Sequence, residues 1–123
     1  IGTATPDRVK KVWQACLAEM DAASLAGHFH NTYGMAIANI YQSLEQGIRV
    51  FDSSIAGLGG CPYAKGASGN VSTEDLYYLL SNMSYDTGID LDALMIASQN
   101  ISQVLQRTNP SNYANAYWQK RCA

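Results

Sequence analysis

Apolar side chains recur three and four positions apart in several stretches of the chain, which is the spacing of one helix face. The first such stretch predicts a helix that begins after Thr5, a residue that can cap it, with Pro6 at the first helical position. Cys16 falls on the apolar stripe of this helix and is therefore expected in the core. The stripe consists of Val9, Val12, Trp13, Cys16, Leu17 and Met20.

Further helices follow from the same spacing. Gly47 is placed to end the second helix, and Ser72-Thr-Glu-Asp75 matches a capping box that begins the third. Asn109-Pro110 ends the longest helix. These helices are expected over residues 33–45, 72–83 and 90–107, with a short one in the tail over residues 111–123.

Two short segments, residues 24–30 and 48–53, are predicted to be strands. The second is mostly apolar, as is typical of a parallel strand that is buried on both faces. The elements then follow in the order helix, strand, helix, strand, helix, helix. Because strands that alternate with helices form parallel sheets with right-handed crossovers, the chain is expected to have an α/β fold.

Composition and charge agree with one folded domain. The 123 residues carry a net charge of −2, and 47% of them are hydrophobic. This mixed, nearly neutral charge gives no indication of nucleic-acid binding, and no apolar run approaches the roughly 18 residues of a membrane span. The N-terminus has no signal or transit pattern. Three widely spaced cysteines favour a reducing compartment.

The two histidines of the chain lie close together, at the end of the first predicted strand. Side chains two positions apart share a face of a strand, so His28 and His30 are expected to point the same way and Phe29 the opposite way. Two imidazoles on one face are good ligands for a divalent metal ion. The alternative is a pair of solvated or hydrogen-bonded histidines.

A glycine-rich stretch, residues 52–70, follows the second strand. It holds five glycines within residues 57–69 and a single cysteine, Cys61, next to Pro62. Such backbone freedom around one thiol suggests a loop that closes over a substrate. An ordinary connector with an inert cysteine is the alternative. Asp52, at the end of the strand, either orients a ligand or is structural.

Two segments carry distinctive motifs. Residues 50–75 include Gly57-Leu-Gly-Gly-Cys-Pro-Tyr63, a highly specific run that resembles the signature loop of the hydroxymethylglutaryl-CoA lyases. The segment that begins His28-Phe-His-Asn-Thr-Tyr-Gly34 resembles the same family's His-x-His-Asp-Thr-Tyr-Gly segment. The similarity runs from residue 1 to about residue 105. The His-x-His pair alone indicates only the wider superfamily, which includes synthases and aldolases.

The resemblance implies a fold and an activity. The expected fold is the C-terminal two-fifths of a TIM (β/α)8 barrel: one partial domain over residues 1–123, with about two parallel strands, their flanking helices and C-terminal helices. The similarity thins over residues 108–123. The implied lyase cleaves 3-hydroxy-3-methylglutaryl-CoA (HMG-CoA) to acetyl-CoA and acetoacetate, in leucine degradation and ketone-body formation. Its partner is this acyl-CoA substrate, and the full-length parent is expected to be a homodimer in the cytoplasm or the mitochondrial matrix.

The resemblance also implies a role for each candidate side chain. His28, His30 and Asn70 would bind Mg²⁺ or Mn²⁺. Cys61 would be the loop thiol that transfers a proton, and His28 would share the acid–base work. Asn31 stands where these lyases usually carry aspartate. No further cofactor is expected.

The family's Arg–Asp pair, from the first barrel strand, does not occur in these residues. The chain is therefore expected to be inactive alone, and three functions stay open. It is the C-terminal part of a lyase that acts with the remaining strands, or a non-catalytic barrel remnant that binds a partner, or part of a related acyl-CoA synthase or aldolase. The run Gly59-Gly-Cys-Pro62 favours the lyase over the synthase.

Overall fold

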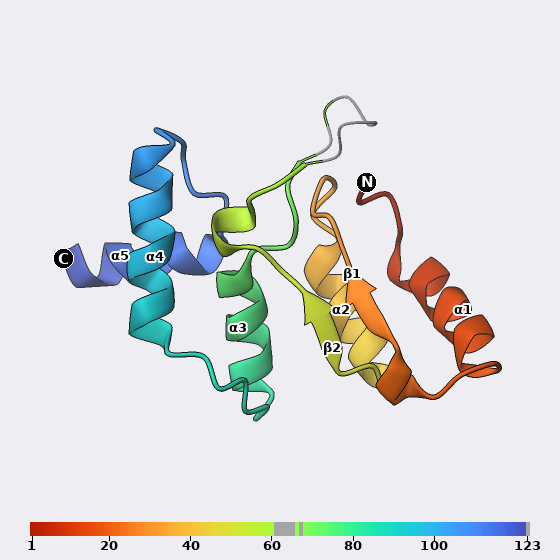
Figure 1. The fold of residues 1–123 in the computed structure, drawn as a ribbon. Coiled ribbons are helices and arrows are strands. Elements are labelled where there is room, and N and C mark those ends of the chain that lie inside the picture. The colour runs from red at the N-terminus through yellow and green to blue at the C-terminus, as the bar shows by residue number, and fades with distance from the viewer. Residues whose placement is uncertain (61–65, 67, 123) are drawn as a thin grey trace. The chain divides into compact units, whose positions relative to one another are not determined.

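Two short parallel strands, β1 (Ala26–His28) and β2 (Val50–Asp52), form the sheet in the computed structural model, which describes residues 1–60, 66 and 68–122. Their register places His28 beside Asp52. The helix α2 (Ala36–Glu45) connects the strands, so the three elements make one βαβ unit (Figure 1). The expected α/β class with two parallel strands is confirmed.

The chain divides into two units. Unit 1 comprises Ile1–Asp52 and Gly59–Val71, and unit 2 comprises Ser53–Leu58 and Ser72–Ala123. Unit 1 holds the sheet and α2, together with α1 (Pro6–Leu17) and the 3₁₀ turn η1 (Ala22–Ser24). Unit 2 is helical and holds η2 (Ile55–Gly57), α3 (Thr73–Asn82), α4 (Leu91–Val104) and α5 (Asn112–Cys122).

The core of unit 1 lies between α1 and the sheet. Val9, Trp13 and Ile48 are its buried residues, and Phe29 and Phe51 of the strand region pack against them. The core is fastened to α2 by hydrogen bonds: the Trp13 indole donates to the Ser43 hydroxyl at 2.7 Å, and that hydroxyl donates to the Asn39 carbonyl oxygen at 2.7 Å. Because a buried indole N–H needs an acceptor, these bonds fix how α1 lies against α2.

In unit 2, side chains cap two helices, at Ser72, as the sequence predicts, and at Asp90. The Ser72 hydroxyl accepts a hydrogen bond from the Asp75 amide at the start of α3, and Asp90 accepts one from the Ala93 amide at the start of α4. The Asp75 carboxylate instead accepts from the Ser111 hydroxyl and the Tyr113 amide. It therefore joins α3 to the first turn of α5, the tail helix, which the sequence also predicts.

Several expected boundaries and burials differ from the structure. Residues 24–30 split into η1, β1 and a single bridge residue at His30, and β2 is shorter than residues 48–53. Val50 is half-exposed, so β2 is not buried on both faces here. Thr5 holds the N-cap position, but its hydroxyl donates to the Asp7 carboxylate and caps no amide.

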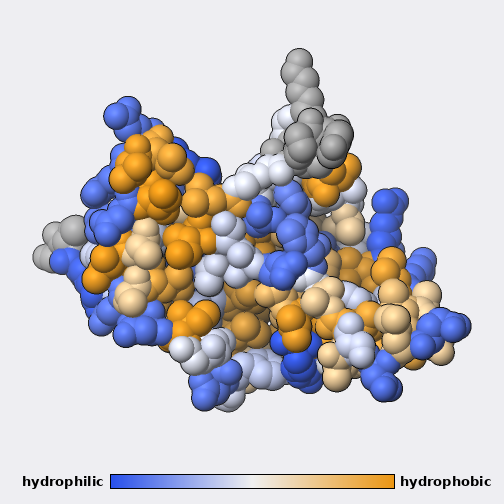
Figure 2. All heavy atoms as spheres, in the orientation of Figure 1, coloured by the Kyte–Doolittle hydropathy of each residue, from blue (hydrophilic) through white to orange (hydrophobic). Residues whose placement is uncertain are grey.

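Some residues of the predicted apolar stripes are exposed or lie outside the helices. Val12 is 58% exposed, and α1 ends before Met20, whereas Cys16 packs against the core as expected. At the end of α4, Val104 is 75% exposed and Leu105 lies beyond the helix. Hydrophobic atoms are accordingly visible on the surface over α4 (Figure 2). Within the described residues, no helix has the length and apolar character needed to cross a membrane.

Candidate metal centre

His28 is the last residue of β1, and the neighbouring strand holds its ring. Its Nδ1 lies 3.0 Å from Oδ2 of Asp52, its partner in the parallel register. Because an ionised carboxylate only accepts, Nδ1 carries the proton and Nε2 is left as the ring's lone-pair donor. This carboxylate–histidine pairing is the usual way to orient a metal-binding imidazole. Asp52 therefore holds the ring of His28 in its orientation, and the role of His28 as a metal ligand stays a prediction.

His30 is held by Ser68 and Asn70, near the end of the glycine-rich stretch. It forms an isolated antiparallel bridge with Asn70, and its Nδ1 lies 3.1 Å from the carbonyl oxygen of Ser68. A carbonyl can only accept, so His30 also keeps Nε2 as its lone-pair donor. Ser68 is held in turn, because its amide donates to the Thr32 hydroxyl at 3.1 Å.

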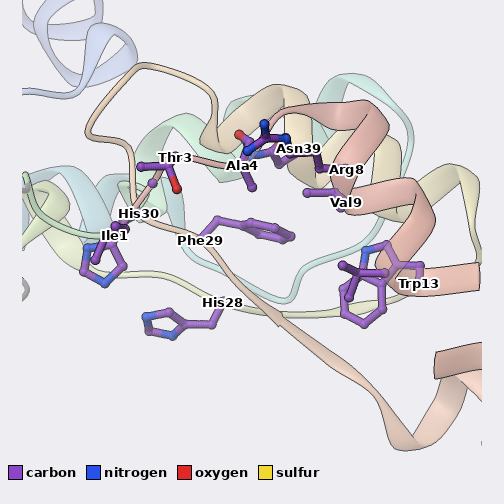
Figure 3. Close-up of a pocket in the computed structure, with 12 residues that line it drawn as sticks. Ile1, Thr3, Ala4, Arg8, Val9, Trp13, His28, Phe29, His30 and Asn39 are labelled. Atoms are coloured by element: carbon purple, nitrogen blue, oxygen red, sulfur yellow. The ribbon is translucent and has the colours of Figure 1, made fainter. Parts of the chain in front are cut away.

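The two histidine rings lie together, as strand geometry predicts. Their centroids are 5.4 Å apart with an angle of 47° between the ring planes. Figure 3 shows both rings on the same side of the chain, while Phe29 between them points toward Val9 and Trp13 in the core. The packing of Phe29 against the core thus fixes the direction of both imidazoles.

Asn70 is brought beside His30 by backbone hydrogen bonds on both sides of it. The Asn31 amide donates to the Gly69 carbonyl at 3.2 Å, and the Val71 amide donates to the Phe29 carbonyl at 3.0 Å. The amide nitrogen of Asn70 also lies against Gly59, where a Cβ atom would come within 2.7 Å of Nδ2. Gly59 therefore leaves the space that the Asn70 side chain fills.

These side chains fit a divalent cation. The two imidazole rings lie together in unit 1, and a backbone bridge joins His30 to Asn70, whose side chain carries an amide oxygen. Amide oxygens suit Mg²⁺ and Mn²⁺, and imidazole suits most divalent metals. Within residues 1–60, 66 and 68–122, no three of His, Cys, Asp and Glu lie together as a metal-binding group. A metal here would thus need Asn70 and donors from beyond the described residues.

Two other residues that the sequence singles out are Cys61 and Asn31. Cys61 lies outside the described residues. The side chain of Asn31 holds the start of α2, because its Oδ1 accepts the Ala36 amide at 3.1 Å. An aspartate carboxylate can accept the same hydrogen bond. The departure from the family's aspartate at this position is therefore compatible with the local structure.

A cavity of about 330 Å³ lies beside the histidines in unit 1, lined by α1, β1 and the N-terminal residues. His28, His30 and Asn39 border it (Figure 3). Sequence reasoning missed Asn39, whose amide donates to the Ala4 carbonyl at 2.9 Å. It also missed the contacts that Thr32 and Ser68 make. These are long-range bonds that no local pattern reveals.

The chain matches a known protein family and solved structures of that family. The HMGL-like family model matches residues 1–101. This chain belongs to the HMGL-like family. It is 53% identical to the hydroxymethylglutaryl-CoA lyase of Pseudomonas mevalonii over 111 residues, which are 90% of this chain and 37% of that protein. It is 48% identical to the human mitochondrial hydroxymethylglutaryl-CoA lyase over 116 residues, 94% of this chain and 36% of that protein.

Solved structures of HMGL-like proteins have the same fold. The crystal structure of the Pseudomonas aeruginosa hydroxymethylglutaryl-CoA lyase matches with a TM-score of 0.92 and 52% identity, over 98% of this chain and 40% of that one. An Acinetobacter baumannii HMG-CoA lyase, solved with coenzyme A and 3-methylmalate, matches with a TM-score of 0.88 and 42% identity, over 94% and 38%. The chain thus spans about two-fifths of the length of these relatives and folds as part of their TIM barrel. Enzymes of this family depend on divalent metal ions in general.

Proposed function

We propose that this chain supplies the metal-binding part of a lyase that cleaves HMG-CoA to acetyl-CoA and acetoacetate. The observation that carries the proposal is the gathering of His28, His30 and Asn70 in one unit of a chain about half identical to hydroxymethylglutaryl-CoA lyases. The cleavage removes the proton of a tertiary alcohol and breaks a carbon–carbon bond. The electron pair of that bond passes to the thioester enolate, which then takes up a proton.

The side chains divide this work. His28, His30 and Asn70 would hold Mg²⁺ or Mn²⁺, which lowers the pKa of a bound alcohol and polarises a carbonyl when it is present. His28, oriented by its hydrogen bond to Asp52, would serve in acid–base transfer at the substrate hydroxyl through Nε2 in the state in which that nitrogen is not bound to the metal. Cys61 would donate its thiol proton to the enolate carbon. The protonated enolate is the product acetyl-CoA.

The remaining expectations are part of the same proposal. The substrate partner is an acyl-CoA, and the complete enzyme is a homodimer in the cytoplasm or the mitochondrial matrix, in leucine degradation and ketone-body formation. The similar proteins include bacterial, cytoplasmic and mitochondrial lyases. Residues 1–123 would act as one partial barrel domain that needs the other strands.

A chimera tests the proposal without relying on where this sequence begins. In it, this chain replaces the matching stretch of the P. mevalonii lyase, to which it is 53% identical. We expect the chimera to convert HMG-CoA to equal amounts of acetyl-CoA and acetoacetate and to lose this activity on exhaustive chelation. A P. aeruginosa relative is named as a lyase for 3-hydroxy-3-isohexenylglutaryl-CoA as well, so that substrate is assayed in parallel.

Two results would reject the proposal. A folded chimera that is inactive with added Mg²⁺ or Mn²⁺ would favour the non-catalytic remnant. Condensation of acetyl-CoA with a keto acid, without cleavage of HMG-CoA, would favour a synthase.

A further inference from the structure

Thr32, in the segment that resembles the family's His-x-His motif, has no role in the chemistry proposed above. It lies two positions after His30, and counted from the antiparallel bridge between His30 and Asn70 it stands opposite Ser68. Its hydroxyl accepts a hydrogen bond from the Ser68 amide at 3.1 Å. All four residues belong to unit 1, so their arrangement is defined within that unit.

The bond to Thr32 limits how the peptide group that follows Ser68 can turn. The Ser68 amide is held by Thr32 Oγ1, and the carbonyl of the next residue, Gly69, accepts the Asn31 amide at 3.2 Å. The Ser68 carbonyl lies between these two anchors and is 3.1 Å from Nδ1 of His30. Ser68 is exposed, so water competes for this carbonyl, and its bond to the ring depends on the anchors.

The N-terminal segment packs against Thr32. At Gly2, which has φ +79°, a Cβ atom would lie 2.9 Å from the Thr32 amide nitrogen and 3.0 Å from its Oγ1. This close backbone approach leaves no room for a side chain at residue 2. Asn39 fixes the same segment, since its amide donates to the Ala4 carbonyl at 2.9 Å (Figure 3). With a β-branched side chain and a packed neighbour, the Thr32 hydroxyl has few directions in which it can turn.

The proton on Nδ1 decides whether His30 can bind a metal ion through Nε2. Neutral imidazole has one N–H and one lone pair, and the hydrogen bond at one nitrogen sets which tautomer is present. For His28 the carboxylate of Asp52 holds the proton on Nδ1. For His30 a neutral backbone carbonyl has that task, and it performs it only while the Ser68 peptide is held in place.

We propose that Thr32 is a positioning residue of the proposed metal centre: its hydroxyl holds Ser68, and through the Ser68 carbonyl it keeps the lone pair of His30 on Nε2. In this role Thr32 contacts neither the metal ion nor the substrate. The proposal rests on the function proposed above, in which His30 is a metal ligand.

Variants of the chimera separate the Thr32 hydroxyl from the bulk of the side chain. Thr32→Val removes the acceptor at nearly constant volume, and Thr32→Ser keeps a hydroxyl. Thr5→Val is the matched control in the same unit, because the Thr5 hydroxyl donates to the Asp7 carboxylate at the start of α1. Nitrogen NMR of isotope-labelled histidine, in alkaline buffer without metal, shows which ring nitrogen of His30 carries the proton. The His30 signal is assigned by its loss in His30→Gln, and titration with Mn²⁺ gives the dissociation constant.

We expect Thr32→Val to move the His30 proton from Nδ1 toward Nε2 and to weaken Mn²⁺ binding about tenfold, the lower end of the effect of losing a ligand's support. Thr32→Ser should keep the tautomer and most of the affinity, and Thr5→Val should match the parent chimera in both. An unchanged tautomer or an unchanged Mn²⁺ affinity in Thr32→Val would overturn the proposal, as would the same two changes in Thr5→Val. If Thr32→Val does not fold, Thr32→Ala takes its place under the same criteria.

Failure of the proposed function is distinguishable from failure of this role, because neither measurement depends on turnover. If the parent chimera binds Mn²⁺ but does not cleave HMG-CoA, the lyase proposal fails and the Thr32 variants still decide the positioning role. If the parent chimera does not bind Mn²⁺, the proposed metal centre fails, and the tautomer alone decides whether Thr32 orients His30.

Discussion

The amide nitrogen of Asn70 lies 2.7 Å from the point where a side chain at Gly59 would place its Cβ atom. The backbone of Gly59 also has φ +104°, which residues with side chains rarely adopt. Glycine is thus needed here for two reasons: the shape of the turn and the space for Asn70. The glycine run of the loop therefore contributes directly to the placement of a proposed metal ligand.

Gly59→Ala is expected to displace Asn70 and to lower Mn²⁺ affinity about tenfold in the chimera, the lower end of the effect of disturbing a ligand's support. Gly34→Ala is the matched control, because Gly34 also has positive φ, at +72°, but has no atom within 4 Å of its Cβ position. Titration of Mn²⁺ with each variant measures the difference. Equal affinities in the two variants would mean that the contact with Asn70 has no influence on the metal.

Cys61→Ser should lower kcat of the chimera about 10²-fold, as expected for a positioned proton donor. KM should change little, because the thiol would act in the transition state and not in uniform binding. Substrate should also protect Cys61 from alkylation, whereas Cys16, half-buried on α1, should react slowly until the protein unfolds. Near-normal kcat in Cys61→Ser would leave His28 or a water as the donor.

The contact between α4 and α5 predicts a pH dependence. The Tyr117 hydroxyl and Arg121 both donate to the Asp92 carboxylate, and they lower the pKa of Asp92 below its ordinary value of 3.8, with the tyrosine as the larger cause. A carboxylate whose folded pKa is lowered stabilises the fold above its unfolded pKa. That contribution is lost as pH falls through the lowered pKa.

Tyr117→Phe should therefore raise the pKa of Asp92 toward the ordinary value, as measured by NMR titration of its carboxyl group. Tyr113→Phe is the control, since the described contacts of Asp92 are with Tyr117 and Arg121. An unchanged Asp92 titration in Tyr117→Phe would show that the hydroxyl does not hold the carboxylate in solution.

The sequence predicted the starts of α3 and α4 better than the end of α4. Ser72 and Asp90 cap α3 and α4 because a short polar side chain and the following amides are neighbours in sequence. At the end of α4 the apolar pattern continues beyond the helix. Val104 is the last residue of the helix and is exposed, and Leu105 lies outside it.

In the candidate site, too, local features could be predicted from the sequence and long-range contacts could not. The common direction of His28 and His30 follows from strand geometry, which is local. The bridge between His30 and Asn70 and the hydrogen bond between Ser68 and Thr32 join residues far apart in sequence. Asn70 was identified as a candidate ligand only through the resemblance to a family, and its contacts with His30 and Gly59 are known only from the structure.

The chain by itself is expected to be poorly stable or to self-associate. Its sheet has two strands, so each strand has an edge with no strand partner among the described residues, and Val50 on β2 is 52% exposed. Isolated two-stranded sheets are marginally stable, and open strand edges pair with other chains. Sedimentation and thermal unfolding of the chain alone measure this. A sharp cooperative melt from a monomer would contradict it.

The most direct test of the account is the lyase activity of the chimera with and without the two histidines of this chain. Acetoacetate formed from HMG-CoA is measured in saturating Mn²⁺ for the chimera and for its His28→Ala, His30→Ala double variant, with folding checked by circular dichroism. We predict cleavage by the chimera and a loss of about 10²-fold or more in the folded double variant, because both a metal site and an acid–base group are removed. Equal acetoacetate formation by the two proteins would contradict the claim that this chain supplies the metal centre.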